Sequence, residues 1–373
     1  LYGISFTKLG LLVLINFLTQ LGVDLMLSFI PHKFNIKKTV RLIPVLVTVG
    51  LLIYAVFPFI FKNHVYTGLV IGTVIFSASS GFNEVLANPL ILSIPSDNPD
   101  KEISKLHAVY PWGVVGVIVV GTAFLFGVGS ENWQWLAILF LLIPITSTAL
   151  FFSTDMPEIE TPQKASGIVK LLKSKMLWLC VVAIFFGGAA EMTMTQWCSA
   201  YLEKSMGIPK IWGDLLGMSL FALFLGLGRT LYAAKGKNIA RVLILGSSGA
   251  FLCYITAAFT GNGAVGIIAC AFTGMCTSMM WPGSIIVASD RFPKGGVFIY
   301  ALMAAGGDLG ASVGPQLVGI ITDKVSALPM AKTLAASLSV STESLGMKAG
   351  LLIAMLFPLA GIFIFNKLRK NKN

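Results

Sequence analysis

Charged side chains are scarce in this chain, since Asp, Glu, Lys and Arg make up 12% of its 373 residues. A soluble domain carries about 25% charged residues. The chain therefore has too little polar surface to stay in water, which excludes an ordinary soluble protein. A net charge of +11 on a soluble protein would suggest a nucleic-acid partner. Here the basic residues lie in short segments between apolar runs, so we expect no nucleic acid.

Motifs that carry catalysis are also missing from the sequence. There is no glycine-rich stretch ending in Gly-Lys-Ser or Gly-Lys-Thr, which an ATP-driven protein would need. There is no His-Glu-x-x-His, paired Cys-x-x-Cys or Gly-x-Ser-x-Gly stretch. The five cysteines lie inside apolar runs, and their odd number argues against a disulfide framework. We therefore expect no enzyme, no cofactor and no metal.

Long apolar runs take the place of these features. A bilayer core needs about 20 apolar residues in a helix, and backbone groups in lipid must bond within the segment. The pattern predicts an all-α polytopic membrane protein in the lipid bilayer, with eleven spans. We place them at residues 7–30, 42–61, 66–94, 106–128, 133–152, 177–202, 211–234, 242–260, 263–289, 296–322 and 347–366.

Lysine and arginine are distributed unevenly between the two sides that these spans define. The larger set lies in segments 33–41, 101–105, 164–175, 235–241, 291–294 and 367–372. Cytoplasmic loops carry the excess of positive charge in membrane proteins. We therefore expect residue 1 outside and the C-terminus in the cytoplasm of a multi-pass cell-membrane protein, such as one of a bacterial inner membrane.

The polar segment 153–176 divides the chain into unequal halves. Five predicted spans lie in the N-terminal bundle, residues 1–152, and six in the C-terminal bundle, residues 177–373. Gly81 precedes Pro89 by eight residues in the third span, and Gly274 precedes Pro282 by eight in the ninth, which suggests two related halves. If the halves are repeats, we expect one further N-terminal helix, the first of a probable twelve.

Ionisable residues inside spans are candidates for function, because each costs several kcal/mol in a bilayer. They are Asp24, Glu84, His107, Glu191, Arg229 and Asp308. When the expected first helix is counted, every third helix carries none of them. This distribution is typical of a bundle in which every third helix faces lipid and the others surround a wet cavity.

The third predicted span carries the most specific motif, Gly81-Phe-Asn-Glu84-Val-Leu-Ala-Asn88-Pro89. It resembles the fourth helix of the fucose-permease-like sugar–proton symporters of the major facilitator superfamily. Further stretches, around His107, Glu191 and Gly310, are similar to bacterial members of the same superfamily. The resemblance implies the superfamily's two-bundle fold and proton-coupled transport.

Two departures from the family pattern concern the N-terminal half. The loop 28–38 keeps the basic residues of the superfamily's motif, but His32 stands where an acidic residue is usual. The first helix, in which the fucose permease has a functional aspartate, has no counterpart among the predicted spans. The resemblance therefore assigns neither the usual charge contact of that loop nor the role of that aspartate.

The candidate residues fall into two groups, each with a structural alternative. Burial shifts a carboxyl toward its neutral form, so Glu84, Glu191 and Asp308 are candidates for proton coupling. Hydrogen bonds or ion pairs between helices are the alternative for each. Asp24 and His107 lie nearer the cytoplasmic end, where a gate or interface is expected.

Sugars present hydroxyls and C–H faces, which amides and aromatic rings bind. The candidates for substrate binding are Asn88, His107, Tyr110, Trp112, Gln196, Trp197, Arg229 and Trp281, with core packing as their alternative.

Four glycines in these spans have a structural interpretation. Small residues let the backbones of membrane helices approach closely. We expect close helix packing, and no contact with the solute, at Gly113, Gly116, Gly310 and Gly314.

These patterns predict a secondary transporter that imports a sugar or similar small polar solute with protons, by alternating access. Its partners would be the solute, protons and lipid. Efflux of drugs or metabolites on the same fold is the alternative, and Glu84 beside Asn88-Pro89 favours import. A membrane enzyme or a non-transporting sensor is a third possibility, which the missing motifs argue against.

The charge distribution makes a prediction about topology. A reporter fused after Asn373 should be active in the cytoplasm, because the basic tail 367–372 belongs to the side with the excess of Lys and Arg. An extracellular reporter signal would reverse the assignment of every loop.

Overall fold

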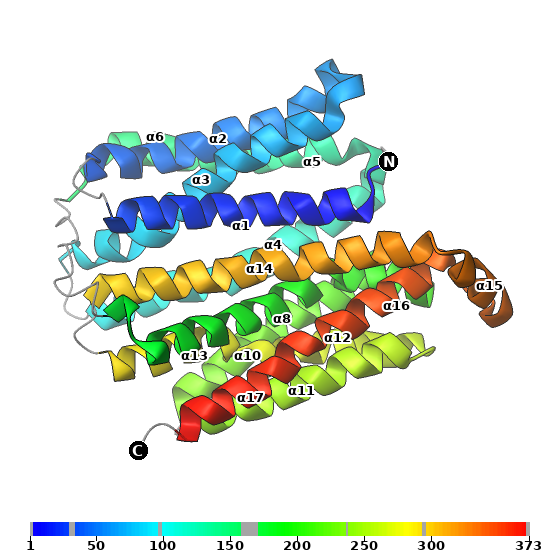
Figure 1. The fold of residues 1–373 in the computed structure, drawn as a ribbon. Helices are drawn as coiled ribbons and strands as arrows, with labels where there is room; N and C mark the ends of the chain where they lie inside the picture. The colour runs from blue at the N-terminus through cyan, green and yellow to red at the C-terminus, as the bar shows by residue number, and fades with distance from the viewer. Residues whose placement is uncertain are drawn as a thin grey trace.

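The structure is a computed structural model that describes residues 3–29, 34–95, 99–157, 171–235, 238–292 and 296–370. Within these ranges, the side chains of residues 28–29, 88–89, 92, 99–108, 111–112, 233–235, 289, 296–298 and 300–301 are not described. The described part of the chain is helical and contains no strand, which confirms the all-α prediction (Figure 1).

The first half of the chain forms α1 (Phe6–Phe29), α2 (Ile36–Ile60), η2 (Lys62–His64), α3 (Val65–Leu92), α4 (Pro99–Val128), η3 (Ser130–Asn132), α5 (Trp133–Phe140) and α6 (Leu142–Ser153). The second half forms α8 (Lys175–Met206), α9 (Lys210–Trp212), η4 (Gly213–Ser219), α10 (Leu220–Lys235), α11 (Ile239–Phe259), α12 (Gly263–Thr277), α13 (Met280–Arg291), α14 (Gly296–Ser326), α15 (Pro329–Leu338), α16 (Thr342–Ala354) and α17 (Leu356–Lys370).

Nine segments among the described residues are long and apolar enough to cross a membrane. The other two predicted spans, 106–128 and 296–322, fall in α4 and α14, which have 30 and 31 residues. At 1.5 Å per residue each of these helices extends about 45 Å, which exceeds the thickness of the hydrocarbon core. The total of eleven spans remains a prediction.

Prolines divide three of the predicted spans into two helices each. Pro144, Pro282 and Pro358 lie a few residues after the breaks between α5 and α6, α12 and α13, and α16 and α17. Proline has no N–H, so it cannot bond the carbonyl four residues earlier, and its ring clashes there. Each break therefore lies at the carbonyl that proline leaves without a helical partner.

Polar side chains fix where other helices begin. Asn35 accepts a hydrogen bond from the Lys38 N–H at the start of α2, and Asn262 accepts from Ala264 and Val265 at the start of α12. These caps satisfy N–H groups that have no partner in the first helical turn. Gly207 ends α8 in the left-handed conformation, with φ of 65°.

The two motif glycines hold corresponding positions in their halves. A Cβ at Gly81 on α3 would meet Val23 and Gln20 of α1, and a Cβ at Gly274 on α12 would meet the backbone of Phe221 on α10. Each glycine thus allows close packing against the helix two spans earlier. This likeness supports related halves, although the boundary segment 153–176 is only partly described.

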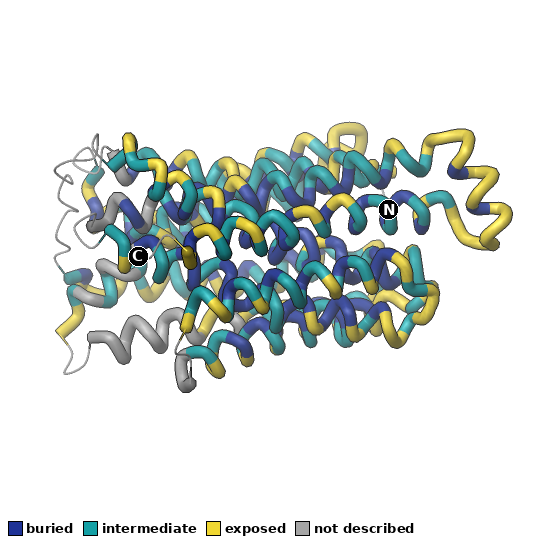
Figure 2. The backbone as a smooth tube through the Cα atoms, turned by 60° about the horizontal axis from the view of Figure 1, so that its bottom comes forward, coloured by how far each residue is buried: buried dark blue, intermediate teal, exposed yellow. Residues whose placement is uncertain are grey.

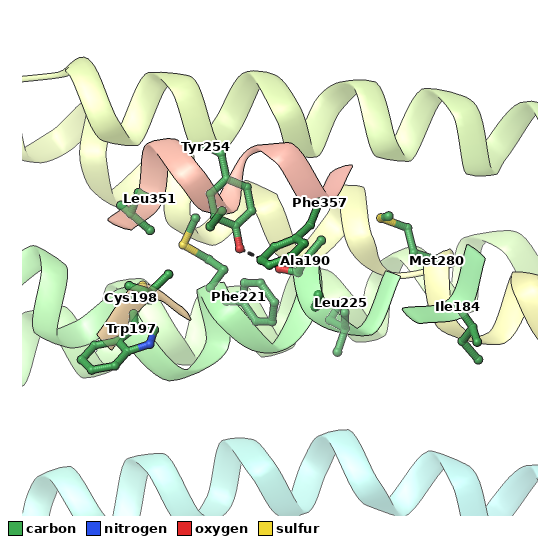
Figure 3. Packing of buried hydrophobic residues seen from close by; sticks show 14 of the residues in the cluster. Ile184, Ala190, Trp197, Cys198, Phe221, Leu225, Tyr254, Met280, Leu351 and Phe357 are labelled. Atoms are coloured by element: carbon green, nitrogen blue, oxygen red, sulfur yellow. Dashed lines mark hydrogen bonds between the residues drawn. The ribbon is translucent and has the colours of Figure 1, made fainter. Parts of the chain in front are cut away.

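Buried side chains fill the second half more densely than the first. Tyr201 and Tyr254 are fully buried between α8 and the helices around it, and the Tyr254 hydroxyl donates to the Ala190 carbonyl at 2.7 Å (Figure 3). A smaller cluster around Leu27, Val40 and Leu86 joins α1, α2 and α3. Leu245 and Phe363 are among the exposed apolar residues, as expected for contact with lipid. Figure 2 shows such exposed positions recurring along the helices.

Helices α1 and α14 lie side by side along most of their length and join the two halves (Figure 1). At the end where α1 begins and α14 ends, called here the outer end after its predicted side, the Asp323 carboxylate accepts from the N–H groups of Phe6 and Thr7, at 3.3 and 2.7 Å. The Trp197 indole donates to the Pro315 carbonyl at 2.9 Å and its ring contacts Phe6. These contacts close the halves together at the outer end.

A second contact between the halves joins α4 to η4, a π-helical segment. Asp214 of η4 is buried and accepts from Ser199, and the Lys210 ammonium lies 3.1 Å from it. Thr122 of α4 lies 3.5 Å from the same carboxylate. Asp214 is therefore held mainly within its own half and only weakly from the other.

The structure confirms close packing at two of the four predicted glycines. A Cβ at Gly310 would lie 1.9 Å from the Phe185 carbonyl oxygen, and one at Gly314 would lie 2.4 Å from Thr193 Oγ1, so both are close contacts between α14 and α8. At Gly113 and Gly116 a Cβ would have no atom of the described side chains or backbone within 4 Å, so the prediction that they are packing points is wrong.

The Gly310 contact gives a test of this packing. Gly310→Ala should lower thermal stability in detergent by roughly 1–3 kcal/mol, because the added methyl group meets backbone that cannot rotate away. Gly116→Ala adds the same atom where there is space and should change stability little. Equal melting temperatures for the two variants would contradict the close approach of α14 and α8.

Candidate functional site

Three carboxyl groups from both halves meet where α1, α3 and α14 come together. Asp24, Glu84 and Asp308 each offer an oxygen, and these oxygens all lie within 4.8 Å of one another. Asp24 and Asp308 are 1% and 2% exposed, whereas Glu84 is exposed. The group therefore has a buried pair that joins α1 to α14 and one member open to its surroundings.

Such a group cannot hold three negative charges at low cost. Like charges at this spacing repel strongly where the dielectric constant is low, so the group favours protons or a bound cation. The Oδ2 atom of Asp308 is buried and has no hydrogen-bond partner among the described residues. The arrangement can therefore take up and release positive charge at a contact between the halves.

An ion pair forms a second polar group in the C-terminal half. Arg229 Nη2 of α10 lies 3.2 Å from Glu191 Oε1 of α8. The Glu191 side chain is 10% exposed and that of Arg229 is 32% exposed. The carboxylate is thus buried behind the guanidinium, which faces a more open space.

Arg229 also bonds a carbonyl that Pro282 leaves without a helical donor, that of Ser278. Pro282 follows the Ser278 carbonyl by four residues and cannot donate to it, and the Arg229 Nε–H donates to that carbonyl at 3.1 Å. In lipid an unsatisfied carbonyl costs several kcal/mol, so the arginine completes the broken helix. The proline of the Gly274–Pro282 motif therefore helps to fix the orientation of Arg229.

Two predicted binding residues are exposed near these groups. Tyr110 of α4 is 61% exposed. It lies close enough to Glu191, Arg229 and Glu84 for their charges to act on its hydroxyl. Gln196 of α8 is also exposed, five residues beyond Glu191. The structure thus brings Tyr110 from one half to the charged residues of both halves.

Trp197 and Trp281, two of the predicted binding residues, have packing contacts instead. Trp197 is 5% exposed, with its indole N–H bonded to Pro315 at the outer end. The Trp281 ring lies against Gly188 and Gly307, where α8 crosses α14. Their contacts are those of core residues, so they are not brought into one open surface with Tyr110.

Three predicted residues cannot be placed. The side chains of Asn88, His107 and Trp112 lie outside the described residues, although their backbone belongs to α3 and α4. A hollow elsewhere, at the inner end between α11, α13 and α17, is lined by Val287, Arg291 and Phe365 among others and contains no predicted site residue.

Sequence reasoning missed two parts of the site. It placed Asp24 at a gate, and the structure groups it with Glu84 and Asp308; the acidic residue in an apolar run was the available signal. It also missed the Ser278 carbonyl as a partner of Arg229. Pro282 was the signal for that contact, because it marks a carbonyl without a helical donor four residues earlier.

A family model described as Major Facilitator Superfamily matches residues 1–315. The chain belongs to the Major Facilitator Superfamily. It is therefore a membrane transporter of that fold and not an enzyme, in agreement with the sequence-based expectation. No curated protein sequence matches the chain.

Solved structures show the same fold over nearly the whole chain. The nucleoside transporter NupG aligns with a TM-score of 0.75 at 9% identity, and the alignment covers 98% of this chain and 92% of that one. A D-xylose–proton symporter gives 0.66 at 15%, covering 95% and 87%. The superfamily transporter FucP in its outward conformation gives 0.52 at 16%, covering 99% of both chains. These similarities show that the chain has the same fold as these transporters, FucP among them.

The ion pair yields a prediction about stability. Arg229→Met should destabilise the protein by up to about 3 kcal/mol, because it leaves Glu191 buried without its partner. The double variant Arg229→Met with Glu191→Leu should recover most of that loss. Thermal unfolding in detergent measures both.

Lys204→Met is the matched control, since it removes an exposed basic side chain from α8 that has no ion pair among the described residues. Loss of an exposed charge changes stability by less than about 1 kcal/mol. If the double variant is as unstable as Arg229→Met alone, Glu191 and Arg229 do not stabilise the fold as a charge pair.

Proposed function

We propose that this transporter takes up a sugar or a similar small polar solute together with protons, by alternating access. The observation that carries the proposal is the group formed by Asp24, Glu84 and Asp308. It joins α1 and α3 of one half to α14 of the other, so a change in its charge acts directly on the contact between the halves. Glu84 is the member that exchanges the coupling proton, because it is exposed while the two aspartates are buried.

The solute binds between the halves beside this group. Tyr110, Gln196 and Arg229 offer a phenol, an amide and a guanidinium, which suit the hydroxyls of a sugar. Asn88, His107 and Trp112 complete the proposed binding set, and Asp308 assists the proton transfer at Glu84. The contacts of Trp197 with Pro315 and Phe6 favour a part in outer closure for that residue.

Glu84→Gln tests the coupling, since glutamine imitates the protonated carboxyl. The variant should lose accumulation driven by a pH gradient while it keeps exchange of labelled solute across the membrane. Exchange needs only the loaded carrier to change its orientation, whereas net uptake needs the empty carrier to return without the proton. Proteoliposomes with an imposed pH gradient measure both activities.

Glu203→Gln is the control, because it removes a carboxylate from α8 away from the group. Accumulation by Glu84→Gln as strong as that of the parent would exclude Glu84 as the coupling residue. If uptake depends on a sodium gradient and not on pH, the coupling ion bound at the three carboxyls is sodium and not a proton. A thermal-shift screen with sugars, organic acids and drugs tests the solute class, and stabilisation by drugs alone would favour efflux.

A further inference from the structure

Arg229 faces the interior of the transporter and not the lipid. Successive residues of an α-helix are separated by about 100°, which places Arg229 about 160° from Leu227 and Leu231 around α10. Both leucines are exposed on the outer face, at 41% and 47%. Arg229 instead shares the face of Ala222 and Leu225, which are buried. Its 32% exposed surface therefore lies on the side of α10 opposite these leucines.

One edge of the Arg229 guanidinium is available on that side. The Nε atom donates to Ser278 and Nη2 donates to Glu191, whereas Nη1 has no partner among the described residues. Tyr110 lies within reach of the same charges from the opposite half. A solute between the halves would therefore meet a guanidinium N–H whose orientation is already fixed by two other bonds.

The charge of this guanidinium is balanced before any solute arrives. Glu191 lies behind it, nearly buried, and its second oxygen Oε2 has no hydrogen-bond partner among the described residues. The carboxylate thus has one charged partner, Arg229. The positive charge of Arg229 is thus already matched by a negative charge within the same half.

We propose that Glu191 sets the charge preference of the solute site, so that the transporter selects an uncharged polyhydroxyl solute and rejects its acidic counterpart. The inference rests on the proposed function, because it assumes that the solute binds beside Arg229. Arg229 Nη1 donates to a hydroxyl oxygen of the solute. A carboxylate at the same place would gain from Arg229 but would be repelled by Glu191, and by Glu84 when that group is ionised.

The test uses pairs of sugars that differ only at C6, where a hydroxymethyl group is replaced by a carboxylate: D-galactose with D-galacturonate and D-glucose with D-glucuronate. Binding to the purified full-length protein is measured by thermal shift and by competition for uptake. The parent protein should prefer the neutral member of each pair. Glu191→Gln, which keeps the shape and removes the charge, should shift the ratio of affinities toward the acid by roughly tenfold or more.

Two further variants separate charge from structure. Glu191→Asp keeps the negative charge and should keep the neutral preference, even with weaker binding. Glu203→Gln removes one charge from the same helix away from Arg229 and should leave the ratio unchanged. An unchanged ratio in Glu191→Gln, or a parent protein that prefers the acids, would overturn the proposal.

A readout without sugar distinguishes this inference from the proposed function. Phenylglyoxal modifies accessible guanidinium groups, and mass spectrometry locates the product. Arg229 should react slowly in the parent and faster in Glu191→Gln, with the exposed Arg241 and Arg369 as references. Equal rates at Arg229 in both proteins would overturn the charge pairing. If no sugar or sugar acid binds while the modification rates of Arg229 differ as expected, the proposal of sugar transport is wrong. The charge pairing of Arg229 with Glu191 is then still supported.

Discussion

The constraint on which this structure depends is that backbone polar groups inside a bilayer need partners within the protein. Helices satisfy most of them, but prolines interrupt three of the spans. At Pro282 the freed carbonyl of Ser278 is bonded by Arg229, which comes from another helix. At this one break the free carbonyl has a charged partner, and the charge of that partner is balanced by Glu191. The most polar part of the C-terminal half follows from the position of one proline.

In the proposed mechanism the two charged groups have different roles. The carboxyls of Asp24, Glu84 and Asp308 carry a charge that protons can change, and they lie at a contact between the halves. Glu191 and Arg229 carry opposite charges that compensate each other within one half. A variable charge at the moving contact suits energy coupling, and a fixed, balanced pair suits recognition. Tyr110 lies within electrostatic reach of both groups.

The sequence predicted the parts of this arrangement that depend on local patterns. Apolar runs predicted the helices, and acidic residues within them predicted Glu84, Glu191 and Asp308 as candidates. It could not predict that Asp24 meets Asp308, because that contact depends on how α1 packs against α14, nearly three hundred residues apart in the chain. The roles of Trp197 and Trp281 were harder to predict, because the local sequence does not distinguish a tryptophan that binds a sugar from one that packs in a core. Their surroundings, such as Pro315 beside Trp197, come only from the fold.

The contact of Asp323 with the first turn of α1 has a consequence for how the outer side opens. Its carboxylate, from the second half, serves as the N-terminal cap of a helix in the first half. When the outer ends part, the N–H groups of Phe6 and Thr7 and the carboxylate all pass to water, which can satisfy each of them. In the proposed alternating access, separation of the outer ends therefore coincides with entry of water at this cap.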